Sequence, residues 1–359
     1  MISVVVPTYN RKENLELCLA ALGMQEYREF EIIVVDDGST DGTFEWLRGK
    51  TDENGIPLKY LSAGPHQGFR APRARNFGVA NSNPDYSLAL FIDSDNLMPS
   101  HILGTYADLH TQHPDCIIVG LYHFLLRMEY GIENLKNDKD FWFRLESMNY
   151  PKLPMPPDAS LKGRKDPRYN DFPDEVEPEL WPATPVGLAA AMGCFSGNIA
   201  YPKNIFWDCG GFWEELIGHG GEDCDLAMTA VEKRHKFLRV KKLIGYHMWH
   251  ARYAPEQQMR EELNCNIGKI DQKHKIGKYA EYAEHAAIDC ADWTDPRHYH
   301  KERGSRLVSD ESNTYWVVIG KHRLGLSNPA ALARVGFDWG DADPITKEAL
   351  AEFKVEGVL

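Results

Sequence analysis

The sequence predicts an α/β protein with a mostly parallel, Rossmann-like sheet flanked by helices. Three short apolar runs, residues 2–6, 32–35 and 88–92, are each followed by Pro or Asp, as expected of buried parallel strands that end in a polar loop. Between the first two runs, leucines recur at helical spacing at positions 15, 19 and 22. Strands that alternate with helices and end in acidic residues are typical of a doubly wound sheet.

The elements follow one another in a regular order. We expect Asn10 to cap the first helix, residues 36–39 to stop the second strand, and Thr40 or Asp41 to begin a further helix. Later elements are a fourth strand candidate at 117–119, a helix after Glu222, a polar helix-prone stretch from Tyr253 to residue 287, and a short strand at 316–319.

The chain is expected to have two parts. Residues 1–253 form the α/β domain, and residues 254–359 form a C-terminal helical and irregular extension that serves acceptor binding or oligomerisation. Residues 151–185 contain nine prolines and many charges, which predicts a long irregular loop. Loops of this length in compact enzymes commonly close over a substrate.

Composition excludes several classes of protein. With 43% hydrophobic and 11% aromatic residues, the chain can form a sizeable core. A net charge of -13 argues against a nucleic-acid binder, although a bound cation would still permit a phosphorylated small molecule. The seven cysteines are widely spaced without a CxxC pair, so neither a zinc knuckle nor a disulfide framework is indicated. We see no signal peptide and no apolar run near the roughly 18–20 residues of a transmembrane helix, and therefore expect a cytoplasmic protein.

Polar residues follow the first two strands at one predicted edge of the sheet. They are Pro7-Thr8-Tyr9-Asn10 and residues 36–39. Ligands of open α/β sheets bind beyond the carboxyl ends of the strands, where an Asp can accept a hydrogen bond from a base N–H. The same residues could also form only a turn with a helix cap. Neither strand is followed by GxGxxG, which argues against a dinucleotide-binding dehydrogenase.

Asp93-Ser94-Asp95 directly follows the apolar run 88–92. Two carboxylates two residues apart on an extended segment can hold one hard cation and leave positions for phosphate oxygens. An exposed acidic turn would have the same sequence. A histidine at a later strand end, His247 or His250, could complete the metal site or serve only a structural role.

The most informative segment is the glycine-framed acidic run from Gly210 to Asp225. Its glycines permit close backbone approach, and its acids open a helix, where negative charge complements the helix dipole. Capping explains one acid but not three acids in four residues. Asp223 could take a proton from an attacking hydroxyl as a general base. Arginines at positions 70, 73 and 75 could reach phosphate or form a solvated basic face.

These residues, in this order, resemble the family-2 glycosyltransferases of the GT-A fold over roughly residues 2–253. The segment 210–225 also resembles an acceptor-side motif shared by β-1,4-galactosyltransferases, chondroitin-polymerase-type enzymes and polypeptide N-acetylgalactosaminyltransferases. His219 departs from that motif, in which a Trp often precedes the two glycines, and this leaves the donor sugar open. The other matching stretches are residues 4–10, 33–39, 75–78 and 93–95.

The resemblance implies an inverting hexosyl- or N-acetylhexosaminyltransferase that uses a nucleotide-diphosphate sugar, most often UDP-linked, and Mn²⁺ or Mg²⁺. It implies that Asp223 is the general base and that Glu222 holds the acceptor or the donor sugar. It places Asp93 at the ribose or the metal and Asp95 on the metal, with His247 preferred over His250 as the third ligand. The remaining residues implied in nucleotide-sugar binding are Pro7, Thr8, Tyr9, Asp36, Asp37, Arg75, Ser94, Trp213 and Gly221.

Two alternatives stay open within this interpretation. A retaining transferase would use the same donor site without Asp223 as a base, and a non-catalytic nucleotide-sugar-binding protein would bind UDP without turnover. Trp213 could cover the apolar face of a sugar or belong to the core. Residues 254–359 do not indicate whether the acceptor is a saccharide, a peptide or a small molecule, and a homo-oligomer is left open.

Overall fold

The computed structural model describes residues 1–124, 131, 133, 135, 194–248, 250, 254–275, 306–310, 312, 314–319, 322–325, 343–351 and 354–358. The proline-rich loop predicted at 151–185, and the predicted helix beyond residue 275, lie outside the described residues. The chain divides into two compact units, the first formed by the described residues up to 122, from 194 to 247 and from 254 to 275. The second unit is formed chiefly by the described residues after 284.

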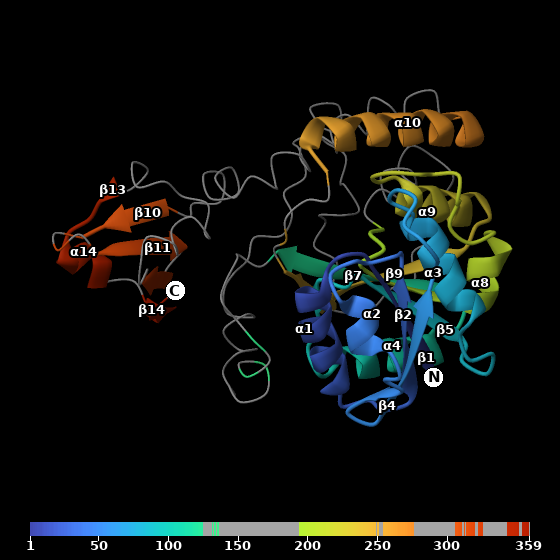
Figure 1. Ribbon diagram of the computed structural model, residues 1–359, viewed down its shortest axis with the longest axis horizontal. Helices are drawn as coiled ribbons and strands as arrows, with labels where there is room; N and C mark the ends of the chain where they lie inside the picture. The colour runs from blue at the N-terminus through green and yellow to red at the C-terminus, as the bar shows by residue number, and fades with distance from the viewer. Residues whose placement is uncertain are drawn as a thin grey trace. The chain divides into compact units, whose positions relative to one another are not determined.

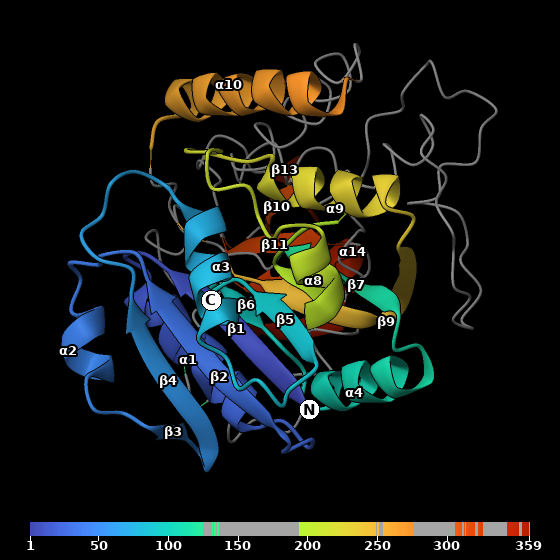
Figure 2. The same ribbon diagram turned by 90° about the vertical axis from the view of Figure 1, so that its right-hand side faces the viewer.

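The first unit is built on a sheet whose nine described strands have the order β3-β4-β2-β1-β5-β8-β7-β9-β6. Its centre is parallel, as the sequence predicts, and consists of β1 (Ile2–Thr8), β2 (Phe30–Asp36), β4 (Ile56–Ser62) and β5 (Leu88–Ile92). Figures 1 and 2 show helices on both faces of this sheet. The predicted mostly parallel sheet flanked by helices is therefore confirmed.

Antiparallel strands extend this parallel centre. β8 (Asn198–Pro202) lies between β5 and β7 (Cys116–Phe124) and runs antiparallel to both. At the far edge, β6 (Asn96–Leu97) pairs with β9 (Lys236–His247), and at the other edge β3 (Asp52–Glu53) pairs with β4. The fourth strand predicted at 117–119 is confirmed as part of β7.

Alternating side chains of the central strands pack against helices on opposite faces. Val4 and Val34 belong to a core that also includes leucines of α1 (Lys12–Gly23) and apolar residues of α4 (Ile102–Gln112). On the other face lies α3 (Ala71–Ala80), where a Cβ on Gly78 would come within 2.4 Å of Val5 Cγ1. The missing side chain thus lets α3 approach the sheet closely.

Asn10 does not cap α1, contrary to the sequence-based expectation. The helix begins at Lys12 with Arg11 at its N-cap position and no side-chain cap. Asn10 has a φ of 50°, and its Oδ1 accepts a hydrogen bond from the backbone N–H of Thr40 at 2.8 Å. The Asn side chain is therefore used to join the loop after β1 to the loop after β2.

The next helix, α2 (Thr43–Leu47), begins later than the predicted Thr40 or Asp41. Its N-cap position is Gly42, with a φ of 87°. Asp41 still contributes to the helix start, because its Oδ1 accepts from the Thr43 backbone N–H at 3.2 Å and from the Thr43 hydroxyl at 2.6 Å.

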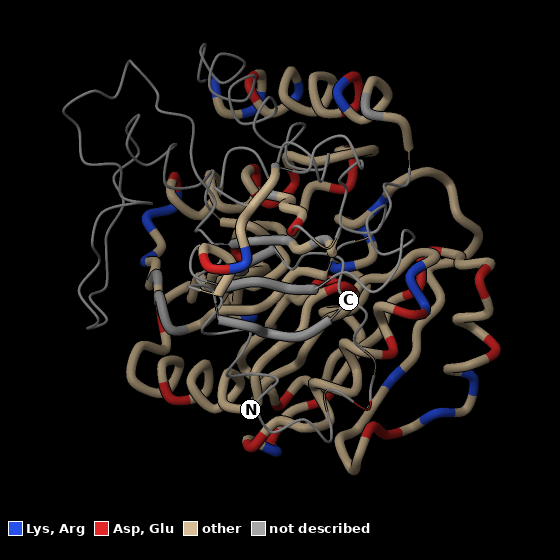
Figure 3. The backbone as a smooth tube through the Cα atoms, turned by 90° about the vertical axis from the view of Figure 1, so that its left-hand side faces the viewer, with Lys and Arg blue, Asp and Glu red and all other residues tan. Residues whose placement is uncertain are grey.

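Further helices belong to the first unit. α8 (Lys203–Asp208) follows β8, α9 (Glu222–Glu232) precedes β9, and α10 (Glu256–His274) lies over α9 in Figures 1 and 2. The helix predicted after Glu222 is confirmed as α9. Figure 3 shows both basic and acidic residues along α10. None of the helices in the described part of the chain is long and apolar enough to span a membrane.

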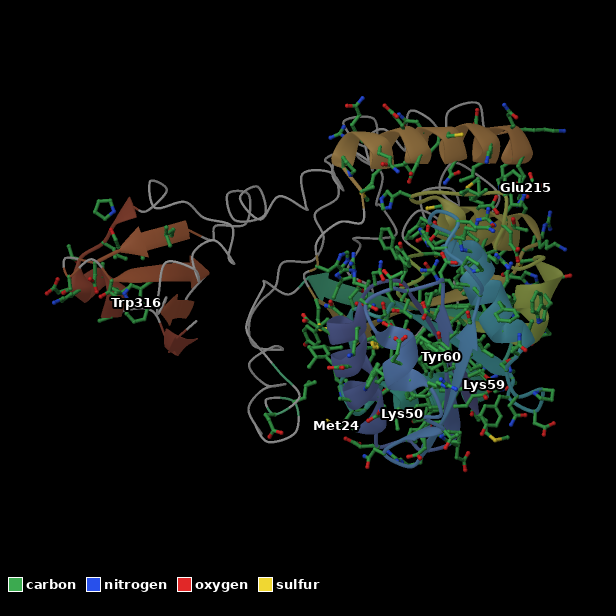
Figure 4. All side chains as sticks on the ribbon, in the orientation of Figure 1. Met24, Lys50, Lys59, Tyr60, Glu215 and Trp316 are labelled. Atoms are coloured by element: carbon green, nitrogen blue, oxygen red, sulfur yellow. The ribbon has the colours of Figure 1, made fainter. Side chains whose placement is uncertain are left out.

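The second unit contains a separate sheet with the order β13-β10-β11-β12-β14 in its described residues. Val308 and Leu350 form its small core, packed against Trp316, which is labelled in Figure 4. The strand predicted at 316–319 is confirmed as part of β11, while the predicted domain boundary after residue 253 stays a prediction. The elements are β10 (Arg306–Ser309), β11 (Tyr315–Ile319), β12 (His322–Gly325), β13 (Asp343–Pro344), α14 (Lys347–Ala351) and β14 (Lys354–Val358).

Candidate active site

The loops after β1 and β2 lie side by side, because Thr8 pairs with Asp36 at the ends of these parallel strands. The backbone N–H of Asp37 donates to the Thr8 carbonyl at 3.0 Å. Asp36 is buried, and its two carboxylate oxygens accept from the Ser39 backbone N–H and the Tyr60 hydroxyl, each at 2.8 Å. Asp36 therefore holds the loop in place through both of its carboxylate oxygens.

Asp37, by contrast, faces a histidine. Nδ1 of His66 lies 3.1 Å from the Asp37 carbonyl oxygen and 3.2 Å from its Oδ2. The imidazole also stacks on the ring of Tyr9, with centroids 3.7 Å apart and planes 9° apart. Burial raises the pKa of Asp37, and the neighbouring His66 opposes this effect. His66 is not among the residues predicted from the sequence, because no pattern around it distinguishes it from an ordinary loop residue.

Thr8 offers an unused hydroxyl at this edge. Its side chain is buried, and within the described part of the chain its Oγ1 has no hydrogen-bond partner. Buried polar atoms are nearly always paired, with protein, water or a ligand. Thr8, together with the partly buried Pro7 before it, therefore lies where a polar ligand could complete the hydrogen bonding.

The sheet also places Asp95 next to His247. Asn96 on β6 pairs with His247 on β9, which brings His247 Nε2 within 3.3 Å of Asp95 Oδ1. Asp95, His247 and His250 each offer one possible ligand atom, and these three atoms all lie within 4.8 Å of one another. Carboxylate oxygens and imidazole nitrogens are both ligands of divalent cations, so these residues fit such an ion chemically.

Asp93 and Arg75 form a different contact. Arg75 lies on α3 and is buried, and its Nη2 donates to Asp93 Oδ1 at 2.8 Å. Its Nη1 donates to Glu222 Oε1 at 2.9 Å, and its guanidinium carbon lies 5.4 Å from the Phe212 ring centroid. Burial alone would lower the pKa of Arg75, but Asp93 and Glu222 raise it overall. Ser94, between the two acids of the triplet, is buried.

Asn76, the neighbour of Arg75, fixes the glycine-framed segment. Its Oδ1 accepts from the Phe212 backbone N–H at 2.9 Å, and its Nδ2 donates to the Phe212 carbonyl at 2.8 Å and to Glu214 Oε1 at 2.9 Å. A Cβ on Gly211 would lie 2.7 Å from Asn76 Oδ1. This approach explains physically why glycine occupies position 211.

Glu222 and Asp223 open α9 after Gly221, whose φ of 95° favours glycine. Glu222 is buried against Arg75, whereas Asp223 is partly buried and accepts from the backbone N–H groups of Cys224 at 2.8 Å and Ser196 at 3.4 Å. Desolvation, with a contribution from the charge of Glu222, raises the pKa of Asp223 to about 7, while Arg75 acts in the opposite direction. A carboxylate of this basicity suits general base catalysis near neutral pH.

Asp225, the third acid of the segment, has a structural role. It is buried and accepts from Lys273 Nζ at 2.8 Å and 2.9 Å. It also lies 2.8 Å from Nε2 of His274, whose Nδ1 is 2.7 Å from Glu232. Asp225 therefore holds the end of α10 against α9.

α10 also covers the glycines that precede α9. Side-chain atoms of α10 lie so close that a Cβ on Gly218 would meet Glu262 at 2.8 Å, and a Cβ on Gly221 would meet Ile270 at 2.8 Å. The backbone N–H of His219 donates to Glu262 Oε2 at 2.9 Å. The backbone carbonyl of Glu215, which Figure 4 labels next to α10, accepts from an α10 lysine.

Trp213 is partly buried rather than fully exposed. The ammonium group of Lys273 lies 4.8 Å from the centroid of its ring system. Trp213 is thus in contact with α10, and whether it also binds the apolar face of a sugar stays a prediction.

The sheet, its flanking helices and the carboxylates at strand ends define the GT-A fold of the glycosyltransferases, as predicted. Residues 3–159 match the family model described as glycosyl transferase family 2, and residues 189–251 match that of the N-terminal domain of galactosyltransferase. The two matches support a family-2 glycosyltransferase.

Curated relatives agree with this class. The chain is 28% identical over 235 residues to validoxylamine A glucosyltransferase of Streptomyces hygroscopicus subsp. jinggangensis, covering 63% of this chain and 50% of that protein. It is 26% identical over 252 residues to hyaluronan synthase of Pasteurella multocida, covering 68% of this chain and 24% of that protein. The chain thus spans half or less of the length of these relatives.

Solved structures show the same fold. S. aureus TarS 1–349 in complex with UDP-GlcNAc has a TM-score of 0.51 at 18% identity, covering 75% of this chain and 66% of that one. GalNAc-T7 with UDP, GalNAc and Mn²⁺ has a TM-score of 0.52 at 16% identity, covering 84% of this chain and 54% of that one.

Proposed function

We propose that the chain is a metal-dependent, inverting glycosyltransferase that moves a hexosyl or N-acetylhexosaminyl group from a UDP-linked donor to an acceptor hydroxyl. The observation that carries this proposal is the continuous charged contact from Asp93 through Arg75 to Glu222, with Asp223 beside it. One end of this contact follows a central strand, where donors of α/β folds bind, and the other end carries a carboxyl whose pKa is raised to about 7. TarS with UDP-GlcNAc and GalNAc-T7 with UDP support a UDP-sugar donor.

In this proposal the nucleotide lies over the ends of β1 and β2. The buried Asp37 and the hydroxyl of Thr8 would bind the base, next to Tyr9. Asp36 would act indirectly, because its carboxylate oxygens already hold the loop. Asp93 and Ser94 come directly after β5. They would therefore lie beside the sugar and the diphosphate at the ends of the strands.

Asp95, His247 and His250 would hold the cation, which when bound neutralises negative charge on the leaving diphosphate and can lower the barrier by several kcal/mol. Mn²⁺ in the GalNAc-T7 structure supports this choice, and Mg²⁺ is the other candidate. The side chains of Asp95 and His247 are both largely buried, so they would restrict water access to the ion.

Asp223 would remove the proton of the acceptor hydroxyl as its oxygen attacks the anomeric carbon. The bond from that carbon to the diphosphate oxygen breaks as the new C–O bond forms on the opposite face, which inverts the configuration. The proton then resides on Asp223 and the nucleoside diphosphate leaves. Glu222 would position the sugar or the acceptor, since Arg75 fixes its carboxylate.

A donor screen tests the proposal. Purified protein is incubated with UDP-, GDP- and dTDP-sugars, with and without Mn²⁺, and thermal unfolding and nucleotide release are measured. We expect at least one UDP-sugar to raise the unfolding temperature and to release UDP, both only with metal. If none of the nucleotide-sugars raises the unfolding temperature, the proposal is rejected. If a nucleotide-sugar binds but no UDP is released with any acceptor tested, the chain is a non-catalytic binding protein.

The stereochemistry is tested separately. Proton NMR of the first product distinguishes the two anomers by the coupling constant of the anomeric proton. We expect the configuration opposite to that of the donor. A product with retained configuration would remove Asp223 from the role of base and favour the retaining alternative.

A further inference from the structure

His66 contacts both Tyr9 and Asp37, so three separate parts of the chain meet at its ring. Tyr9 follows β1, Asp37 follows β2, and His66 lies in the loop after β4. The His66 ring lies flat on Tyr9, with centroids 3.7 Å apart and planes 9° apart. Its Nδ1 is directed at Asp37, 3.1 Å from the carbonyl oxygen and 3.2 Å from Oδ2. A planar heteroaromatic ring thus stacks on one aromatic face and presents a ring nitrogen to a carboxylate.

A nucleobase offers the same chemistry. Bases stack on aromatic side chains through their π-faces, and a ring N–H donates to a carboxylate or a carbonyl oxygen. The imidazole therefore stacks on Tyr9 and faces Asp37, the two residues beside which the proposed function places the base of the donor.

The loop that carries His66 is packed against the end of β2. The backbone N–H of Ala63 donates to the Asp36 carbonyl at 2.8 Å, and a Cβ on Gly38 would lie 2.4 Å from the His66 backbone nitrogen. Gly64 and Gly68 on either side of His66 have φ values of 93° and 89°. The backbone is thus fitted to the site, while the His66 side chain is 26% exposed and can be reached from solvent.

We propose, as an extension of the proposed function, that the His66 ring and the base of the nucleotide are mutually exclusive occupants of one place. The base must then displace the imidazole from Tyr9 and Asp37. The apparent affinity for the nucleotide is then the intrinsic affinity multiplied by the fraction of molecules whose His66 ring has left that place. His66 is accordingly a residue that sets nucleotide affinity, and it acts on nucleotides of any sugar in the same way.

Calorimetric titration of UDP in the presence of Mn²⁺ tests this proposal with the wild type, His66→Ala and a control, His101→Ala, at an exposed position before α4. We expect His66→Ala to bind UDP about tenfold more tightly than the wild type. This factor corresponds to a His66 ring that occupies the base position in about nine of ten wild-type molecules. His101→Ala should bind like the wild type. Equal or weaker binding by His66→Ala would overturn the proposal, because it would make His66 a bystander or a contact of the nucleotide.

A second measurement uses the wild type and does not depend on a variant that folds. NMR should show the His66 ring protons shifted upfield by the Tyr9 ring, and addition of UDP should remove this shift. A shift that persists at saturating UDP overturns the proposal and leaves the proposed function intact. If wild type and His66→Ala both fail to bind UDP or any other nucleotide, the proposed function itself fails and this inference fails with it.

Discussion

Arg75 donates from Nη1 to Oε1 of Glu222 at 2.9 Å, across a sequence separation of 147 residues. The same guanidinium reaches Asp93, so a single buried side chain connects α3, the end of β5 and the start of α9. Two charge-assisted hydrogen bonds from one planar fork fix the relative positions of the groups that accept them. The proposed donor end and the proposed base are therefore held in register by a contact within the protein.

The first prediction concerns this contact. Arg75→Ala leaves Glu222 buried without its counter-charge, and removing one partner of a buried pair typically costs about 3–5 kcal/mol. Since Asp93 is partly exposed, we expect a loss near the lower figure in the free energy of unfolding, measured with urea. Arg73→Ala on the same helix, whose side chain is partly exposed, is the matched control and should change stability by less than about 0.5 kcal/mol. Equal effects of the two variants would contradict the prediction.

The second prediction concerns Asp223. Asp223→Asn removes the base while preserving shape, so donor binding should be unchanged and transfer should fall by about 10²–10⁴-fold. Because the base must be deprotonated, wild-type transfer should rise with pH through the pKa of about 7. Glu215→Gln, an exposed acid in the neighbouring loop, is the control. Initial rates between pH 5 and 9 provide the measurement, and a flat profile or an active Asn variant would refute the assignment.

The third prediction concerns the metal. Removing either Asp95 or His247 should raise the Mn²⁺ concentration needed for half-maximal activity by at least about tenfold, since loss of a group that only hydrogen-bonds to a metal ligand already weakens metal binding by about 10–100-fold. His250→Ala tests whether that residue also ligates, and it should behave like His247→Ala if it does. His113→Ala, after α4, should leave the Mn²⁺ dependence unaltered. Unchanged Mn²⁺ titrations for Asp95→Asn and His247→Ala would exclude this site.

The fourth prediction concerns the docking of α10. Burial lowers the pKa of His274, but its hydrogen bonds to Asp225 and Glu232 raise it overall. A histidine whose folded pKa is raised stabilises the protein fully below its unfolded pKa of about 6.5, and this stabilisation is lost as the pH rises through the folded value. The free energy of unfolding should therefore fall across that interval in the wild type and fall less in His274→Gln. Parallel pH profiles of the two proteins would show that His274 does not carry the dependence.

Much of the sheet could be predicted, because β1, β2 and β5 each contain a short run of buried apolar residues that ends in a polar loop. β8 could not. Its sequence Asn-Ile-Ala-Tyr-Pro has no clear alternation, and it becomes a strand by pairing with β5 and β7. The helix start at Asn10 was predicted wrongly for a related reason: its side chain finds a partner in Thr40, 30 residues away.

The candidate site, like the sheet, could be predicted from the sequence only in part. Acids at strand ends could be identified from position alone, since parallel strands end at one edge of a sheet. Which acid is free for chemistry depends on its hydrogen-bond partners, most of which are distant in sequence. Asp36 accepts from the nearby Ser39 and from the distant Tyr60. Asp225 contacts two residues of α10. No local pattern reveals the contacts with Tyr60 and α10.

The position of β8 has a consequence for biosynthesis. β5 pairs with β8 across more than a hundred residues of intervening chain, so the middle of the sheet closes only after Pro202 has left the ribosome. Contacts of such long range are slow to form, because a large loop must close before they stabilise the chain. A nascent chain that ends before residue 222 already carries Arg75 and Asp93 but lacks Glu222, the second carboxylate that accepts from Arg75. We therefore expect translation to deliver an incomplete sheet with Arg75 and Asp93 first, and the contact from Arg75 to Glu222 only once α9 has emerged.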